Sequence, residues 1–296
     1  MQKKYQKYAA CLVLLFCISC ESIQKETKKE TNTDSISQRD EKKVAKNYQK
    51  IICIGNTITD IVRQMGLAEK IIAYDQALPQ DTAFKRPKVG YGASLRAEHL
   101  RTHQPDLVLS WAKDSPEEIV NLMKGEKVAY ELFEEPQNFE DLLKLLQSVG
   151  TILNKNKEAE QLVNQLKEEM QTLKNKTAKI KQPIRLLYIK ASTAESILML
   201  GKNTPIHAIL TYAGCINAGD SWDEITQLND ENLAIAEPTF LIMSTKSAEI
   251  AYKNPAFLAL NIVKTGRVIT IPEYKMNMSL QTPKVAQEIY KKVYGQ

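Results

Sequence analysis

The sequence contains few of the side chains on which acid–base and metal-dependent enzymes rely. Its 296 residues include only three histidines, and no cluster of acidic residues accompanies them. Four catalytic or nucleotide-binding motifs are also absent from it, namely His-Glu-x-x-His, Gly-x-Ser-x-Gly, the P-loop and Gly-x-Gly-x-x-Gly. We therefore expect a protein that is not an enzyme and holds no catalytic cofactor.

Cysteine is scarce as well, with five in the chain. Cys11 and Cys17 fall in an N-terminal leader, and Cys20 closes that leader. Only Cys53 and Cys215 remain, far apart in the sequence and each in an apolar setting. Two distant thiols make a poor disulfide or metal signature, so we expect both to be buried as small apolar side chains.

The apolar run near the N-terminus is too short to cross a bilayer. It covers residues 9–18, whereas a spanning helix needs about 20 residues. The positive charges before it are Lys3, Lys4 and Lys7. This pattern is typical of a secretory signal, and its end resembles a bacterial lipoprotein box, although Cys17 stands where Leu is usual. We expect residues 1–19 to be removed and Cys20 to carry a lipid that anchors the protein to a membrane from outside the cytoplasm. The alternative is a plain secretory signal with an incidental cysteine.

A strong charge of one sign is also missing. The formal net charge is +5, and removal of the three leader lysines would leave +2. This balance gives no support for nucleic-acid binding, which needs a concentrated basic face. Residues 20–47 are polar and nearly free of large apolar side chains, so they are predicted to form a flexible tether.

Strand-like and helical patterns alternate along the rest of the chain, which favours an α/β fold with parallel sheets. Residues 138–180 differ because they are almost wholly helical in pattern, with a weak point at 150–156. The second half of this region would form a helix of about 22 residues, or about 33 Å. Strands are predicted at 51–55, 70–74, 107–111, 128–132, 184–189, 197–201, 236–243 and 267–271.

Two segments of the chain repeat one arrangement. Glu98 precedes Pro105 by seven residues, and Glu231 precedes Pro238 by seven residues. In both segments a short helix, a proline turn and a buried strand are predicted. We therefore expect two Rossmann-like lobes joined by a single long helix, with a ligand cleft between the lobes. The predicted boundaries are an N-terminal lobe at 48–154, an interlobe helix at 155–181 and a C-terminal lobe at 182–296.

The body of the chain resembles the periplasmic-binding-protein family that serves importers of haem, cobalamin and iron-siderophores. The resemblance covers about residues 51–295. It depends on the stretch from Val89 through Gly90-Tyr91 to Val108, on residues 54–73 and 201–218, and on Gly266-Arg267-Val268-Ile269. It is greatest for the haem-binding members. The resemblance implies the two-lobed fold and delivery of ligand to an ABC-type permease with its ATPase.

In the haem-binding members the Tyr of a Gly-Tyr pair is the axial iron ligand, which implies that role for Tyr91. A phenol oxygen binds ferric iron as the phenolate, and Tyr is a known type of axial haem ligand. These members often have Arg two residues after the Tyr, near a propionate, but here that residue is Ala93. Arg96 is therefore expected to contact the ligand instead. The alternatives are Lys88, Lys85 or propionates that face solvent.

A second axial ligand is not defined by any motif. His207 follows Thr204-Pro205 on a predicted helix, and a lone histidine there is more often structural than a ligand. Met276 and Met278 lie with Tyr274 in the loop after the last strand, which faces the cleft in this family. A thioether can bind haem iron. We therefore keep His207, Met276 and Met278 as candidates for ligand binding.

Members of the family dock to their permease through one Glu on each lobe, and Glu98 and Glu231 are the matching positions. Carboxylate–arginine pairs have the directional geometry that such docking requires. The alternative is that both are only exposed charges on helices. For the ligand, cobalamin and a ferric siderophore stay open beside haem. An envelope scaffold and a relative of the metal chelatases are the alternatives outside transport.

Overall fold

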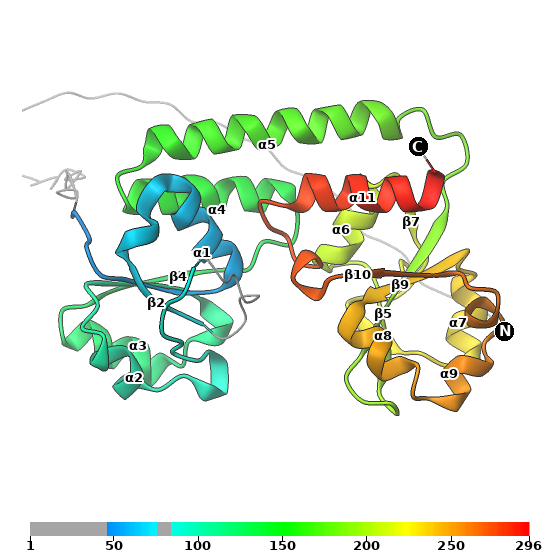
Figure 1. Cartoon of the computed structure of the whole chain (residues 1–296), viewed down its shortest axis with the longest axis horizontal. Coiled ribbons are helices and arrows are strands. Elements are labelled where there is room, and N and C mark those ends of the chain that lie inside the picture. The colour runs from blue at the N-terminus through cyan, green and yellow to red at the C-terminus, as the bar shows by residue number, and fades with distance from the viewer. Residues whose placement is uncertain (1–45, 76–83, 296) are drawn as a thin grey trace, which may run out of the picture. The chain divides into compact units, whose positions relative to one another are not determined.

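The computed structural model describes residues 46–75 and 84–295, and Lys43–Gln296 form one compact unit. The predicted signal, Cys20 and all of the predicted tether except Lys46 and Asn47 lie outside the described residues. Two sheets lie beneath a layer of long helices in this unit (Figure 1). The mixed α/β fold with two lobes is the predicted one.

The N-terminal lobe is built on a four-stranded sheet in which all strands are parallel. Along the sheet the strands are β2 (Ile71–Tyr74), β1 (Ile51–Ile54), β3 (Leu107–Trp111) and β4 (Ala129–Phe133). Central strand β1 is apolar throughout because both faces of the sheet are covered. Ile51 and Cys53 belong to one hydrophobic core, whereas Ile52 and Ile54 belong to another.

Short helices connect these strands. They are α1 (Asn56–Val62), which continues into a π-helical turn at Arg63–Leu67, α2 (Ala97–Thr102) and α3 (Glu117–Gly125). Gly55 and Pro116 occupy the N-cap positions of α1 and α3 without a side-chain cap. The hydroxyl of Ser115, which precedes Pro116, donates to Ser110 Oγ at 2.6 Å inside the lobe.

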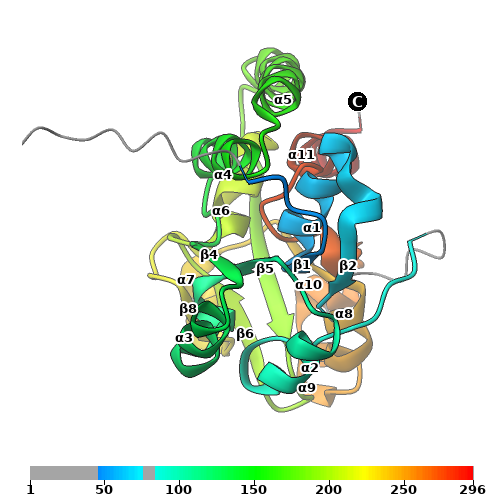
Figure 2. The same ribbon diagram turned by 90° about the vertical axis from the view of Figure 1, so that its left-hand side faces the viewer.

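The helical layer is formed by α4 (Phe139–Ile152), α5 (Asn156–Thr177) and α11 (Thr282–Tyr294). In Figures 1 and 2, α5 lies above α4 and α11, and it packs against both. Its 22 residues lie within the predicted interlobe helix. The predicted weak point corresponds to the break between α4 and α5. Near this break Gly150 packs directly against Ala159. A larger residue would not fit there, because a Cβ on Gly150 would lie 2.5 Å from the Ala159 Cβ.

The C-terminal lobe corrects the expectation of purely parallel sheets. Its strands are β5 (Arg185–Ala191), β6 (Ile197–Leu200), β7 (Ile216–Asn217), β8 (Ile225–Gln227), β9 (Phe240–Ser244) and β10 (Val268–Ile271), in the order β10-β9-β5-β6-β8 with β7 beside β5. Strands β10, β9 and β5 are parallel. Strand β6 runs antiparallel to both β5 and β8.

The helices of this lobe are α6 (Pro205–Tyr212), α7 (Asp230–Ala236), α8 (Thr245–Ala251), α9 (Pro255–Ala259) and α10 (Asn261–Lys264). Helices α8 to α10 were not predicted. The core beneath the helical layer contains residues from both lobes, including Ile51 and Leu186. Cys53 and Cys215 are both buried and free, which confirms their predicted role. Within the described ranges, none of the helices combines the length and the apolar character that crossing a membrane requires.

Candidate functional site

The strand order of the N-terminal sheet marks one place at which a ligand is expected. From β1 the chain passes to β2 on one side and later to β3 on the other. In open parallel sheets, ligands bind outside the carboxyl ends of the strands where the order reverses in this way. Here those ends carry Gly55, directly after β1, and Trp111, the last residue of β3.

Gly55 and Trp111 pack so closely that only glycine fits. Gly55 has a φ of +124°, and a Cβ built on it would lie 2.3 Å from the indole Nε1 of Trp111. The indole is buried. This pair lies at the switch point, and no motif in the sequence indicated it. A glycine directly after a buried strand was the available signal, but its partner depends on the strand order.

The loop that carries Tyr91 extends from the same carboxyl edge. Residues 87–89 pair with the end of β2, since the Val89 N–H donates to the Tyr74 carbonyl at 2.9 Å. The short helical turn Gly92–Ser94 then contacts the turn Ala112–Asp114 that follows Trp111. Tyr91 therefore lies on the side of the sheet where the switch point opens.

The backbone at Tyr91 is fixed while its side chain is exposed. The Tyr91 N–H donates to Ser94 Oγ at 3.1 Å, and the Ser94 hydroxyl donates back to the Tyr91 carbonyl at 2.8 Å. Gly90 and Gly92 both have positive φ, and a Cβ on Gly90 would lie 2.8 Å from the Ser94 carbonyl oxygen. The side chain of Tyr91 is 42% exposed. The loop thus presents a phenol from a defined backbone position.

Arg96 is close to this loop, but part of its guanidinium is already engaged. Its Nη1 donates to the Ala93 carbonyl at 2.7 Å and to the Leu95 carbonyl at 2.8 Å. The side chain of Asp114 lies close to the Tyr91 loop at Gly92, since a Cβ on Gly92 would lie 3.7 Å from Asp114 Oδ1. Burial raises the pKa of the Asp114 carboxyl. Contact between Arg96 and a ligand remains a prediction, with the rest of its guanidinium as the available donor.

His207 is half-buried and lies beside the side-chain amide of Asn217. Gly219 N–H donates to Asn217 Oδ1 at 3.0 Å, and Asn217 Nδ2 donates to the carbonyls of Gly201 and Leu200 at 3.1 and 3.3 Å. The same Nδ2 lies 3.4 Å from His207 Nδ1. Binding of a ligand by His207 remains a prediction.

Met276 and Met278 were expected to face the cleft, and the structure corrects this expectation. Both are buried in the core that the two lobes share. The Thr282 hydroxyl donates to the Met278 sulfur at 3.4 Å. The Met278 carbonyl accepts from Thr57 Oγ1 of the N-terminal lobe at 3.1 Å. These methionines pack between structural elements, so their assignment to the ligand has no support from their surroundings.

The repeated arrangement around Glu98 and Glu231 is present in the structure. Each Glu is exposed and is the second residue of its helix, α2 or α7. Each helix leads through a residue in the left-handed region, Gln104 or Glu237, into a proline and a parallel strand. Acidic residues in a first helical turn also stabilise the helix itself. The position is thus shared by both lobes, and permease docking remains a prediction.

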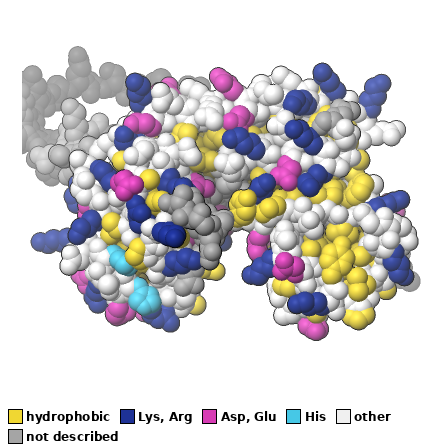
Figure 3. All heavy atoms as spheres, in the orientation of Figure 1, with side chains coloured by type: hydrophobic (Ala, Val, Ile, Leu, Met, Phe, Trp, Pro, Cys, Tyr) yellow, Lys and Arg dark blue, Asp and Glu magenta, His cyan; other side chains and the backbone are white. Residues whose placement is uncertain are grey.

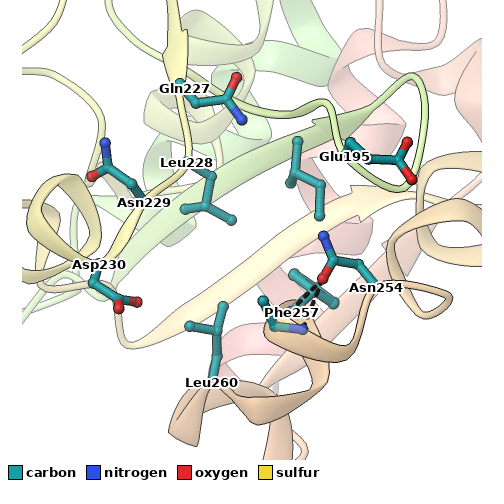
Figure 4. Close-up of a pocket in the computed structure, with 10 residues that line it drawn as sticks. Glu195, Gln227, Leu228, Asn229, Asp230, Asn254, Phe257 and Leu260 are labelled. Atoms are coloured by element: carbon teal, nitrogen blue, oxygen red, sulfur yellow. Dashed lines mark hydrogen bonds between the residues drawn. The ribbon is translucent and has the colours of Figure 1, made fainter.

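A separate cavity lies in the C-terminal lobe beside α7 and α9 (Figure 4). Its volume is about 120 Å³, below the 300 Å³ or more that is usual for small-molecule sites. The Asn254 side chain in its wall is fully used, since Oδ1 accepts from the N–H groups that open α9 and Nδ2 donates to the Ala194 carbonyl. The cavity is too small for a macrocycle.

The described part of the chain contains no group of three or more His, Cys, Asp or Glu side chains placed to hold a metal ion. The histidines visible in Figure 3 lie at the surface of the N-terminal lobe.

Comparison with known proteins adds three findings. The family model described as periplasmic binding protein matches residues 51–275. An uncharacterized ABC transporter substrate-binding lipoprotein, YvrC of Bacillus subtilis (strain 168), is 23% identical over 234 residues, which are 77% of this chain and 74% of that protein. Solved structures also share the fold.

Two of these structures illustrate the match. The periplasmic haem-binding protein RhuT from Roseiflexus sp. RS-1, in apo form, superposes with a TM-score of 0.77 at 20% identity, covering 83% of this chain and 98% of RhuT. The periplasmic haem-binding protein BhuT in complex with two haems gives a TM-score of 0.76 at 25% identity, covering 84% of this chain and 99% of BhuT.

Proposed function

The chain belongs to the periplasmic binding protein family, whose model matches residues 51–275, and from this premise we propose that it captures haem for an ABC-type importer. In this proposal the ligand lies in a cleft between the two lobes, with Tyr91 as an axial ligand of the iron. The protein binds its cargo and hands it over without converting it.

The observation that carries the proposal is the placement of Tyr91. Its phenol is exposed on a loop with a fixed backbone, at the carboxyl edge of an all-parallel sheet. Ferric iron bound to a porphyrin lacks only axial ligands, so one phenolate from the protein suffices to bind it. The two flanking glycines let a flat macrocycle approach the backbone. The haem-binding names of RhuT and BhuT support the same ligand class.

Delivery to a permease rests on different residues. Glu98 and Glu231 occupy equivalent exposed positions on the two lobes, and two carboxylates on one protein can fix its orientation against basic residues of a permease. The name of YvrC supports an ABC transporter partner and a lipid anchor. We place the anchor at Cys20, which lies outside the described residues, and the protein on the outer side of a membrane in the cell envelope.

The proposal is tested by titrating the purified chain with ferric protoporphyrin IX and recording its Soret absorbance. A saturable one-to-one change is expected for the wild type. Tyr91→Phe should weaken binding by about tenfold or more, which corresponds to about 1.4 kcal/mol, and should change the spectrum of the remaining complex. Tyr252→Phe is the matched control, because that ring is similarly exposed but packs edge-on against Phe257.

Two results would contradict parts of the proposal. Without saturable binding of haem, cobalamin and ferric siderophores become the next ligands to titrate. If Tyr91→Phe binds haem with unchanged affinity and spectrum, haem remains the cargo but Tyr91 is not its ligand.

A further inference from the structure

The small cavity of the C-terminal lobe lies beside one of the two glutamates proposed for docking. Asp230, the first residue of α7, lines the cavity, and Glu231 follows it in the same helical turn. Helix α9 forms another wall through Ala256 and Phe257. Figure 1 shows α9 and α2, the helix of Glu98, at the ends of the two lobes that face away from α5. The cavity therefore lies on the side of the molecule where docking is proposed.

The cavity combines an apolar interior with a negatively charged rim. Ile197 and Phe257 in its wall are buried, and the Leu228 N–H donates to the Ile197 carbonyl at 2.9 Å. Asp230 and Glu195 are exposed and lie on opposite sides of the cavity in Figure 4. Neither carboxylate has an ion-pair partner among the described residues. None of the ten described residues that line the cavity is basic.

The helix starts at the cavity leave few donors for an anion. At α7 the Asn229 Oδ1 accepts from the Asn232 N–H at 2.7 Å. At α9 the Asn254 Oδ1 accepts from the N–H groups of Ala256 and Phe257 at 2.8 and 3.3 Å. These caps occupy N–H groups with which a helix start binds anions. Together with the two carboxylates, they favour a positively charged occupant.

The size of the cavity suits one side chain better than a free ligand. Its volume of about 120 Å³ is below the range of small-molecule sites. An arginine side chain has an aliphatic stem that packs on apolar surface, while its charged end stays in contact with water. The planar guanidinium has five N–H donors and pairs well with carboxylates at interfaces. Arginine is also enriched among the residues that contribute most to protein–protein binding.

We propose that this cavity receives an arginine side chain of the permease when the protein docks through Glu231. This inference rests on the proposed delivery function. The equivalent positions of Glu98 and Glu231 do not distinguish one lobe from the other. Strands β6 and β8, which contribute to the cavity, have no counterpart in the described sheet of the N-terminal lobe. The cavity therefore specifies in which direction the two-lobed protein sits on the permease.

The first test measures the affinity of the full-length protein for vesicles that contain the permease and its ATPase. Ala256→Trp fills the cavity without changing a charge, and it should weaken docking by about tenfold. Ala259→Trp is the matched control, because Ala259 is also exposed on α9 but does not line the cavity. Its affinity should stay within about twofold of the wild type. Thermal unfolding and the titration with ferric protoporphyrin IX should be unchanged in both variants.

The second test uses the protein without the permease and identifies the occupant. The probes are N-acetylarginine methylamide and its neutral isostere N-acetylcitrulline methylamide. The arginine probe should shift the methyl NMR signals of Leu228 and Leu260 saturably in the wild type, and this shift should be absent from Ala256→Trp. The citrulline probe should bind the wild type about threefold or more weakly, and Asp230→Asn should weaken the arginine probe by a similar factor.

The outcomes separate this inference from the proposed function. If the wild type binds neither ferric protoporphyrin IX nor the permease vesicles, the proposed function itself fails. If the wild type docks and Ala256→Trp docks equally well, only the role of the cavity is overturned. Equal weakening by Ala256→Trp and Ala259→Trp would also overturn it, because the cause would then be added bulk on α9. An arginine probe that binds no better than the citrulline probe would overturn the basic occupant.

Discussion

The N-terminal lobe is built on one all-parallel sheet, whereas the C-terminal lobe adds the antiparallel strands β6 and β8 to a parallel set. The parallel parts carry the features that the lobes share. In both, a short helix with an exposed Glu leads through a left-handed residue and a proline into a buried strand. The antiparallel addition carries the small cavity of Figure 4 and has no counterpart in the described part of the other lobe.

Each lobe also contains a glycine that is required by a tryptophan, but the contact differs. Gly55 leaves room for the indole ring of Trp111, while Gly201 leaves room for the backbone carbonyl of Trp222, which would lie 2.1 Å from an added Cβ. In the N-terminal lobe the close contact lies at the edge where the ligand is expected. In the C-terminal lobe it joins the end of β6 to the segment before β8. This difference allows stability and ligand binding to be separated by mutation.

The largest effect is expected for Gly55→Ala. The new Cβ clashes with Trp111, which costs about 1–3 kcal/mol for overpacking, and the positive φ adds about 1–2 kcal/mol. We therefore expect a loss of about 3 kcal/mol in the free energy of unfolding, measured with urea. Because Trp111 lies beside the loop of Tyr91, the affinity for ferric protoporphyrin IX should also fall.

Two further glycines serve as controls for that substitution. Gly66 has a positive φ but nothing within 4 Å of an added Cβ, so Gly66→Ala should cost only about 1 kcal/mol. Gly201→Ala should destabilise the protein by about 2 kcal/mol through the backbone clash and leave the affinity of the folded protein unchanged. Equal loss of affinity in Gly55→Ala and Gly201→Ala would remove the distinction between the two contacts.

The next largest effect is expected for the exposed Glu residues of α2 and α7, the helices that occupy equivalent positions in the two lobes. Glu98→Gln and Glu231→Gln should each reduce haem-dependent transport by about tenfold, and the double variant should reduce it further, since distant sites are usually additive. Haem affinity should stay within about twofold of the wild type because both side chains are exposed on the outer helices. Transport into vesicles that contain the permease and its ATPase is the measurement.

Glu117→Gln is the matched control, since Glu117 is also an exposed residue in the first turn of a helix. A loss of haem binding in the double variant would contradict the docking assignment. Unchanged transport would leave the two carboxylates with only their helix-stabilising role.

Sequence patterns predicted the parts of this fold that depend on local periodicity. The break between α4 and α5, the 22 residues of α5 and the Glu–Pro spacing were all readable because helical and strand periods extend over many residues. Helices α8 to α10 have only four to seven residues each, too few to establish a period. The antiparallel direction of β6 depends on the strands beside it. Its own four apolar residues do not indicate in which direction the strand runs.

The candidate site was predictable only in part, for the same reason. Glycines lie on both sides of Tyr91, and a pair of glycines so close together is typical of a loop, which local sequence determines. Met278 is buried in a core shared by both lobes, and its carbonyl accepts a hydrogen bond from Thr57, which is 221 residues away. Its position in a loop gave no indication of these contacts. The pairing of Gly55 with Trp111 required the order of the strands. The position of Asn217 beside His207 likewise arises from tertiary packing.

At neutral pH the smallest effect is expected from the two buried thiols, one in each lobe. Burial raises the pKa of Cys215 to about 11 and raises that of Cys53 strongly, with the charge of Asp75 adding to the second shift. An exposed thiol ionises near pH 8.5, so the unfolded chain loses these protons first and stability falls as the pH rises above that value. Cys215→Ala should remove up to about 1.4 kcal/mol per pH unit of this decline between pH 8.5 and about 11, measured from urea unfolding at each pH. Cys53→Ala should likewise reduce the decline in stability by up to about 1.4 kcal/mol per pH unit. Its effect should continue above pH 11, because the pKa of the Cys53 thiol is raised more strongly. A decline that neither substitution alters would mean that both thiols ionise alike in the folded and unfolded chain.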